Sequence, residues 1–247
     1  MQLLFDIGNT RVKWAYYSDA DIQSSGSIKA VDVCKSVLDE TFSASAQPDS
    51  IWISNVGSAE VLEAVVDGCT DLYKVTPTIL KISASSHGIL NKYQSQDTLG
   101  VDRWVAAIGA RLLVPTGDVI IVDAGTAVTI DWLSHKEVFE GGVILPGFSL
   151  MHSSLIKNTA GIKAKFSQSQ KIIGRTTEEC VNSGVSYGLV GAIDRMVHEI
   201  QQVIVKDSTI ILTGGSAPLI DAMSKFDMIV QPDLVLLGVA SIATGLR

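Results

Sequence analysis

The amino-acid sequence predicts an α/β protein built from two related domains. An apolar run that begins at Leu3 ends in Asp6, a spacer, Gly8 and polar residues, which is typical of a strand entering a tight polar turn. The same pattern returns around Asp123, about half of the chain length later. A repeat at this distance indicates duplicated domains. The chain has 247 residues, of which 47% are hydrophobic, so two domains can each bury a core.

Charge and cysteine content exclude several classes of function. The chain carries 19 basic and 26 acidic residues, a net charge of −7, and has no basic run, which argues against nucleic acid or an anionic membrane as partner. Cys34, Cys69 and Cys180 are scattered, so neither a disulfide framework nor a zinc site is predicted. The N-terminus enters a strand directly, and no apolar run approaches about 18 residues. We therefore expect a soluble protein of the cytoplasm.

The first polar turn has the composition of a phosphate-binding loop. Leu3–Phe5 is predicted to be a buried strand and Val12–Tyr17 the strand that returns beside it. Gly8 would let a phosphate approach the backbone without a Cβ atom in the way, and Asp6 could hold a metal ion or its water. The side chains that could add donors are Asn9, Thr10 and Lys13. An isolated turn of this kind can also arise for conformational reasons alone, but the second copy favours a function.

The rest of the first half alternates strands and helices. Polar residues 20–27 are expected to form a turn, residues 31–42 a helix, residues 51–56 a strand, residues 59–68 a helix and residues 72–75 a short strand. Gly57 and Ser58 can start and cap the helix at 59. This order is a β-to-α unit.

A helix is predicted after Gly100, because apolar residues at 101, 104, 105, 108 and 112 follow helical spacing until Pro115. Asp102 and Arg103 fall in its first turn. They are either favourable charges near a helix N-terminus or a general base with an anion clamp. The boundary between the domains is placed at Pro115–Asp118, which gives domains 1–115 and 116–247.

The second half repeats the strand pair and then becomes rich in glycine. The glycines of residues 140–147 indicate close backbone contact, either with a ligand or between strands. Residues 148–159 are expected to form a helix, 160–171 a polar and mobile segment, and Thr176 or Thr177 to cap a helix that runs to Ile200. Small residues on that helix indicate close packing, within the chain or across a dimer: Ser183, Gly184, Ser186, Gly188 and Gly191. Residues 209–216 form a strand entering a Gly-Gly turn, and residues 238–245 lie in a last apolar helix.

These motifs resemble those of a known superfamily. No Gly-Lys and no Gly-x-Gly occurs, so neither a Walker loop nor a dinucleotide fingerprint is available. The paired hairpins and the Gly-Gly turn resemble the actin, sugar kinase and Hsp70 ATPases, in which two RNase H-like domains with mixed sheets bind ATP in the cleft between them. Within that superfamily the chain resembles the type III pantothenate kinases. The motifs that carry this resemblance are Asp6–Lys13, Gly100–Arg103, Asp123–Ala127, Gly141–Gly147 and Gly174–Thr177.

The resemblance implies an enzyme that phosphorylates pantothenate with ATP and Mg²⁺, the first step of coenzyme A biosynthesis. It implies that ATP is bound by Asp6, Ile7, Gly8, Asn9, Thr10, Arg11, Val12, Lys13 and Thr126. It implies that pantothenate is bound by Tyr93, Gly100, Val101, Asp102, Arg103 and Thr177. Asp102 would accept the proton, Asp6 would hold Mg²⁺ through water, and Asp123 would hold a monovalent cation, K⁺ or NH₄⁺.

The resemblance also implies a homodimer with shared active sites, in which Thr177 reaches the substrate of the partner subunit. The family often has Asn where Thr176 stands, so the choice between Thr176 and Thr177 stays open. Two alternatives remain. One is another small-molecule kinase or a phosphatase of the same superfamily, and the other is a nucleotide-binding regulator without kinase activity.

Overall fold

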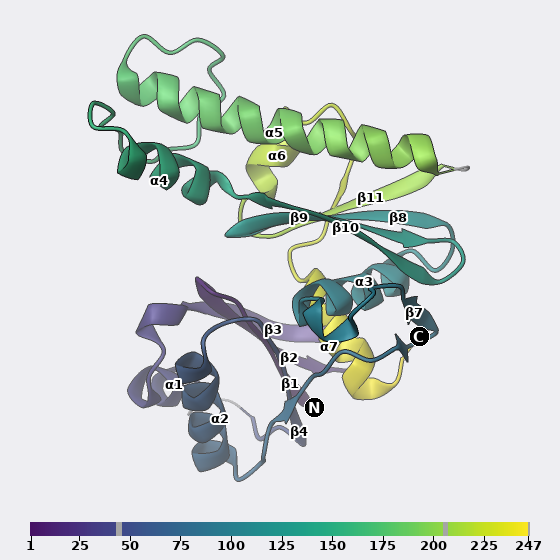
Figure 1. Ribbon diagram of the computed structural model, residues 1–247. Coiled ribbons are helices and arrows are strands. Elements are labelled where there is room, and N and C mark those ends of the chain that lie inside the picture. The colour runs from purple at the N-terminus through teal and green to yellow at the C-terminus, as the bar shows by residue number, and fades with distance from the viewer. Residues whose placement is uncertain (43–45, 205–206, 247) are drawn as a thin grey trace. The chain divides into compact units, whose positions relative to one another are not determined.

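The computed structural model describes residues 1–42, 46–204 and 207–246, which form two compact units (Figure 1). The first unit comprises Met1–Pro115 together with Asp233–Arg247, and the second comprises Thr116–Pro232. Each unit contains a mixed β-sheet covered by helices, which confirms the predicted fold class of two α/β domains.

The first unit is built on a five-stranded sheet in the order β3-β2-β1-β4-β5. Its central strand runs antiparallel to β2 and parallel to β4, so the sheet is mixed. The strands are β1 (Gln2–Ile7), β2 (Arg11–Ser18), β3 (Asp21–Lys29), β4 (Ser50–Asn55) and β5 (Thr78–Ile79). A small antiparallel pair follows, made of β6 (Ser85–Ser86) and β7 (Ile89–Asn91).

Helices cover both faces of this first sheet. The helices are α1 (Lys35–Phe42), α2 (Ala59–Tyr73), α3 (Val101–Leu113) and α7 (Leu234–Thr244), with single 3₁₀ turns at Ala30–Asp32 and Gln96–Thr98. Helices α1 and α2 pack on the face that carries Phe5 and Ile53, where Phe42 and Tyr73 complete an apolar core. Helix α7 contacts β1, and helix α3 contacts β4. In Figure 1 these two helices lie on the other side of the sheet from α1 and α2.

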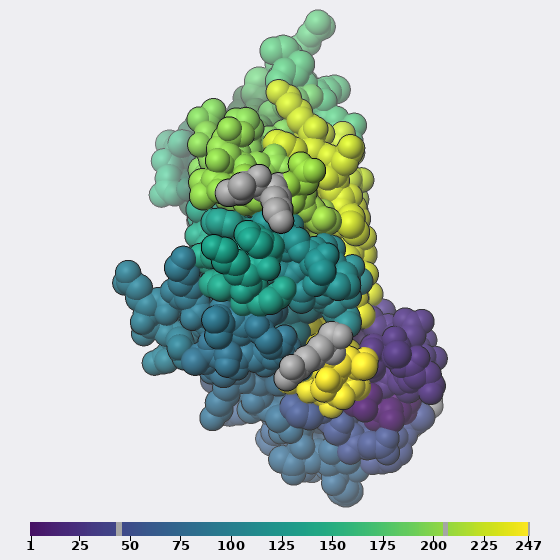
Figure 2. All heavy atoms as spheres, turned by 90° about the vertical axis from the view of Figure 1, so that its right-hand side faces the viewer, coloured from purple at the N-terminus to yellow at the C-terminus, as the bar shows by residue number. Residues whose placement is uncertain are grey.

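The last helix was expected in the second domain, but it belongs to the first unit. Glycines allow its backbone to touch that of α3. A Cβ atom on Gly238 would stand 2.0 Å from the carbonyl oxygen of Val105, and one on Gly109 would stand 2.3 Å from that of Leu234. In the space-filling view, yellow atoms of the C-terminal segment lie against purple and blue atoms of the first part of the chain (Figure 2). The chain therefore returns to its first unit after completing the second.

The second unit repeats the sheet order of the first. Its strands follow the order β12-β11-β8-β9-β10, with β8 antiparallel to β9 and parallel to β11. The strands are β8 (Asp118–Ala124), β9 (Ala127–Ser134), β10 (Val138–Pro146), β11 (Ser208–Thr213) and β12 (Ile229–Val230). The helices are α4 (Phe148–Asn158), α5 (Thr177–Val203) and α6 (Ala217–Met223). The duplication expected from the sequence is thus present in the topology.

Side chains of α5 hold the polar segment that precedes it. Asn182 donates to the carbonyl oxygen of Lys165 at 2.9 Å and accepts from the backbone N–H of Ser167 at 3.1 Å. The hydroxyl of Ser186 accepts from the N–H of Ser169 at 3.2 Å. The segment expected to be mobile therefore has no regular secondary structure, yet it is hydrogen-bonded along the helix. Within the described residues, none of the helices has the length and apolar character needed to cross a membrane.

Two local predictions in the first half are wrong. Residues 20–27 were expected to be a turn, but most of them belong to strand β3, and the actual turn lies at Asp19 and Ala20 with φ of 53° and 62°. Positive φ at both central residues is typical of a two-residue hairpin turn. Residues 72–75 were expected to be a strand, but α2 continues to Tyr73 and Lys74 ends it in the left-handed conformation, with φ of 57°.

Candidate functional site

Backbone hydrogen bonds fix the turn between β1 and β2 around Gly8. The Gly8 N–H donates to the carbonyl oxygen of Arg11 at 3.0 Å, and a Cβ on Gly8 would stand only 3.3 Å from that oxygen. The carbonyl oxygen of Ile7 accepts from the N–H groups of Val56 and Gly57 at 2.9 and 3.0 Å. These bonds fix the turn while the side chains of Asn9 and Thr10 stay exposed.

The strand register places the first carboxylate beside a cation. Asp6 is paired with Lys13 across the antiparallel ladder and with Ser54 across the parallel one. Asp6 and Lys13 are both half-buried. Asp6 and Lys13 thus lie together at one end of the sheet. The side chains of Ile7 and Val12 are buried in the core on the opposite face, so these two residues can offer a nucleotide only their backbone groups. The Arg11 guanidinium donates to the Ser27 hydroxyl at 2.7 Å.

The turn between β8 and β9 is the counterpart in the second unit. Asp123 is paired with Thr129 on one side and with Thr213 on the other. Thr126 is exposed at the turn, and its carbonyl oxygen accepts from the Gly147 N–H at 3.0 Å. A Cβ on Gly147 would stand 2.5 Å from that oxygen, so the residue must be glycine for this contact.

Two further glycines of the second unit make close backbone contacts. A Cβ on Gly142 would stand 2.2 Å from the carbonyl oxygen of Ile130, so this glycine serves the packing of β10 on β9. Gly214, with φ of 93°, lies against the β8–β9 turn, since a Cβ there would stand 2.5 Å from the carbonyl carbon of Ala124. The N–H of Ser216 donates to the Ala124 oxygen at 3.0 Å. The Gly-Gly turn is therefore attached to the second hairpin.

The first turn of α3 presents a carboxylate of raised pKa. One oxygen of Asp102 accepts from the N–H of Arg103 at 2.8 Å. Burial raises the pKa of this carboxyl above its usual value, and the hydrogen bond and the charge of Arg103 offset only part of that rise. A Cβ on Gly100 would stand 2.5 Å from the same oxygen, so the carboxylate occupies the space that a larger residue at 100 would need.

Arg103 links the helix to the segment that contains Tyr93. Its guanidinium donates to the Tyr93 hydroxyl at 2.7 Å, and its central carbon lies 5.6 Å from the centre of the Tyr93 ring. The Arg103 residue is only 6% exposed. Tyr93 is held in turn by its N–H, which donates to the side chain of Asn91 at 3.0 Å. The residues predicted to bind substrate in the first unit, Tyr93 and Gly100–Arg103, therefore form one cluster.

The start of α5 distinguishes Thr176 from Thr177. The Thr176 hydroxyl accepts from the N–H of Glu179 at 3.1 Å, so Thr176 is the N-cap and Thr177 is the first helical residue. Gly174 packs against this first turn, because a Cβ there would stand 2.4 Å from the N atom of Cys180. Both threonines line a cavity of about 890 Å³ between α4 and α5.

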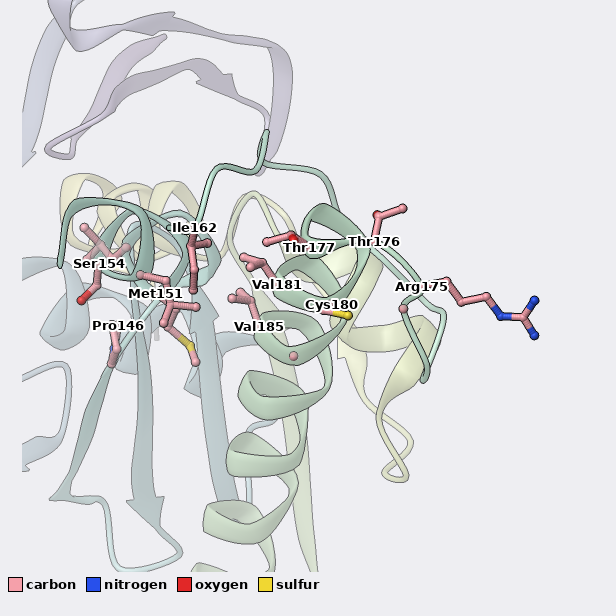
Figure 3. Close-up of a pocket in the computed structure, with 14 residues that line it drawn as sticks. Pro146, Met151, Ser154, Ile162, Arg175, Thr176, Thr177, Cys180, Val181 and Val185 are labelled. Carbon is pink, nitrogen blue, oxygen red and sulfur yellow. The ribbon is translucent and has the colours of Figure 1, made fainter. Parts of the chain in front are cut away.

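Apolar side chains form most of that cavity's wall. Val181 and Val185 of α5 face Met151 of α4 and Ile162, whereas Arg175 extends away from the cavity (Figure 3). Gly184 also lines it, and a Cβ on Gly184 would meet no described atom within 4 Å. The cavity lies entirely within the second unit.

Sequence reasoning overlooked the end of β4. The Asn55 side chain accepts from the N–H of Gly57 at 3.1 Å, and a Cβ on Gly57 would stand 2.9 Å from the Gly8 oxygen. This segment therefore supports the first polar turn from the neighbouring strand. The signal available in the sequence was the run Ser54-Asn55-Val56-Gly57-Ser58 after an apolar strand.

Comparison with solved structures shows which proteins share this fold. A ROK family glucokinase from Streptomyces griseus, solved with glucose and AMPPNP, matches with a TM-score of 0.54 at 11% identity over 99% of both chains. A protein from Campylobacter jejuni, whose name places it among Baf family transcriptional activators, matches with a TM-score of 0.61 at 20% identity over 98% of both chains. These likenesses show the fold alone. The chain has the two-domain fold of the sugar kinases and actin-like ATPases.

Sequence comparison identifies the family. The family model for type III pantothenate kinase matches residues 2–199. The type III pantothenate kinase of Nitrosococcus oceani is 32% identical over 249 aligned residues, which cover 98% of this chain and 94% of the relative. The chain belongs to the type III pantothenate kinase family, and the resemblance inferred from its motifs is confirmed.

Proposed function

We propose that the protein transfers the γ-phosphoryl group of ATP to the primary hydroxyl of pantothenate and forms 4′-phosphopantothenate, the first step of coenzyme A biosynthesis. The observation that carries the proposal is the Asp102 carboxylate in the first turn of α3, oriented by the N–H of Arg103. Membership of the family supports the same reaction. The alternative of a regulator without kinase activity is not favoured, and we place the reaction in the cytoplasm.

Asp102 is the general base in this proposal. The carboxylate takes the proton of the pantothenate hydroxyl as the hydroxyl oxygen attacks the γ-phosphorus atom, and ADP leaves with the electrons of the broken P–O bond. A raised pKa makes a carboxylate a stronger base, which favours this role. Gly100 and Val101, which precede it in the chain, are assigned to the same substrate. The guanidinium of Arg103, held by the Tyr93 hydroxyl, pairs with the substrate carboxylate.

The nucleotide is assigned to the two polar turns. Residues 6–13 and Thr126 bind the phosphates, with Gly8 allowing close approach and Lys13 neutralising charge. The half-buried Asp6 carboxylate fits a Mg²⁺ ion held through water, because hard cations prefer oxygen ligands. When bound, this ion neutralises the charge of the phosphate oxygens.

A monovalent cation fits the second turn better than the first. Asp123 stands between two threonines, Thr129 and Thr213, whereas Asp6 stands beside the ammonium-bearing Lys13. Carboxylate and hydroxyl oxygens suit K⁺ or NH₄⁺. We therefore assign the cation to Asp123.

The active unit is proposed to be a homodimer formed through α5. A Cβ on Gly184 or Gly191 would meet no described atom within 4 Å, so packing inside the chain does not explain the small size of these residues. A partner helix that approaches closely would explain it. Since the Thr176 hydroxyl caps the helix, Thr177 is the residue assigned to the partner's substrate.

One assay tests the reaction itself. The protein is incubated with ATP, Mg²⁺, K⁺ and pantothenate, and the products are analysed by mass spectrometry. We expect phosphopantothenate together with an equal amount of ADP. Glucose and N-acetylmannosamine serve as alternative acceptors, and phosphorylation of a sugar in preference to pantothenate would contradict the proposal. ATP binding without transfer to any acceptor would favour the regulator.

Complementation tests the shared site. An Asp102→Asn chain and a Thr177→Val chain, each poorly active alone, are mixed under exchanging conditions. In a shared-site dimer, one site then carries both defects and the other carries neither, so activity should return toward half of the wild-type value per mixed dimer. If native mass spectrometry finds mixed dimers and activity does not return, Thr177 does not act across the interface.

A further inference from the structure

Ser54 lies next to Asp6 in the first sheet. The parallel register pairs Asp6 with Ser54, and adjacent strands lie about 4.8 Å apart. The flanking residues Phe5 and Ile53 both belong to the core under α1 and α2, so Asp6 and Ser54 share the opposite face. A serine hydroxyl and an aspartate carboxylate in this relation can be joined by rotation about their side-chain bonds.

The Ser54 hydroxyl is a buried polar group without a partner. The residue is 0% exposed, and its oxygen has no hydrogen-bond partner among the described residues. Buried polar groups in folded proteins are nearly always hydrogen-bonded, because an unpaired one loses its bonds to water without replacement. The alternation of side chains along β4 does not require a serine at position 54, since the smaller alanine would also fit there. The hydroxyl therefore calls for a partner beyond the contacts of the described residues.

We propose that Ser54 is a positioning residue for the nucleotide's metal ion, whose hydroxyl donates to the Asp6 carboxylate when MgATP binds. The bond fixes the carboxylate in the orientation that receives the Mg²⁺-bound water, as outer hydrogen bonds commonly do at metal sites. Lys13, which faces Asp6 across the antiparallel register, cannot replace the Ser54 hydroxyl, because the Lys13 ammonium group competes with Mg²⁺ for the same carboxylate. This inference rests on the proposed nucleotide role of Asp6.

Calorimetric titration of the full-length protein with MgATP, and with ATP in EDTA, tests the proposal. The measured quantity is the ratio of the two dissociation constants, which gives the contribution of Mg²⁺. We expect Ser54→Ala to reduce that contribution about tenfold, the effect of one hydrogen bond to a charged group, with metal-free ATP binding unchanged. Ser50→Ala is the matched control, because Ser50 lies on the same strand and the same face, opposite Gln2.

Two further readouts separate positioning from a structural role. Because the hydroxyl is unpaired without ligand, Ser54→Ala should leave the melting temperature of the ligand-free protein unchanged or raised, and should reduce only the increase caused by MgATP. In an Asp6→Asn background, Ser54→Ala should have no additional effect on the Mg²⁺ contribution.

The outcomes distinguish this proposal from the proposed function. If wild-type protein does not bind MgATP more tightly than ATP, the role of Asp6 fails and Ser54 loses its partner. If wild type shows the Mg²⁺ contribution and Ser54→Ala retains it in full, the inference about Ser54 alone is overturned. A lowered melting temperature of the ligand-free variant with an unchanged Mg²⁺ contribution would make the hydroxyl structural.

Discussion

Replacing Gly100 with alanine should misplace the Asp102 carboxylate, the proposed general base, without unfolding the protein. The new Cβ would stand 2.5 Å from an oxygen of Asp102. Real Cβ contacts begin at about 3.0 Å, so the carboxylate must move by about half an ångström or more. The backbone itself accepts alanine, since Gly100 has φ of −62° and ψ of 131°. The strain is relieved by a flexible side chain and not by the helix.

The expected loss follows from the geometry of proton transfer. A misplacement of about 1 Å can cost about 100-fold in rate, so a shift of half that size or more should lower kcat by about 10- to 100-fold. The free energy of unfolding should change by less than about 1 kcal/mol, because only one carboxylate rotamer is disturbed. Binding of ATP should stay within a few-fold, since the nucleotide is assigned to other residues.

The assay couples ADP release to a spectrophotometric readout, with urea unfolding measured on the same samples. Gly161→Ala is the control, because a Cβ on Gly161 meets no described atom within 4 Å, and it should keep full activity. Wild-type kcat in Gly100→Ala would refute the idea that the position of this Asp102 oxygen matters for turnover.

Three other predictions use the same assays. Asp102→Asn should lower kcat about 100-fold or more. Because burial raises the pKa of the Asp102 carboxyl, the wild-type protein loses stability as pH rises through that pKa. The Asn variant should therefore become the more stable protein toward high pH, and the opposite trend would contradict the burial argument. Raising Mg²⁺ should partly rescue Asp6→Asn and raising K⁺ should partly rescue Asp123→Asn, whereas indifference of the wild-type rate to K⁺ would remove the second assignment. Gly238→Ala should destabilise by about 1–3 kcal/mol or more in urea, because its Cβ would stand 2.0 Å from a backbone oxygen of α3, and wild-type stability would contradict this.

The sequence was most informative where local chemistry determines structure. The hairpin at Asp6 could be predicted because an apolar strand, a glycine turn and a second strand are adjacent in the chain, and the structure has β1 and β2 there. The helix after Gly100 could be predicted because its apolar spacing ends at proline. Ser58 was expected to cap a helix, and its hydroxyl accepts from the N–H of Val61 at 3.4 Å.

Contacts between distant segments could not be read from the sequence. The return of α7 to the first unit depends on Gly109 and Gly238 meeting across more than a hundred residues, and neither glycine indicates its partner. The Arg103–Tyr93 bond likewise joins a helix to a segment without long regular structure. The small residues of α5 indicated close packing, but only the structure shows that the Asn182 side chain bonds the backbone of residues 165 and 167.

The duplicated topology gives each unit an aspartate at the same place, with a different neighbour across the hairpin. Asp6 and Asp123 each lie one residue before the last pair of an antiparallel hairpin. Each also lies beside a parallel strand, β4 or β11, that leads into a turn with glycine. What differs is the residue across the hairpin, which is Lys13 in the first unit and Thr129 in the second. The ammonium of Lys13 beside Asp6 is a charge that belongs to the protein, whereas Thr129 is uncharged, and on the proposed assignment a cation from solution takes the corresponding place beside Asp123. The requirement for a monovalent ion would then follow from a single cross-strand position, and Thr129→Lys is the substitution that should abolish it.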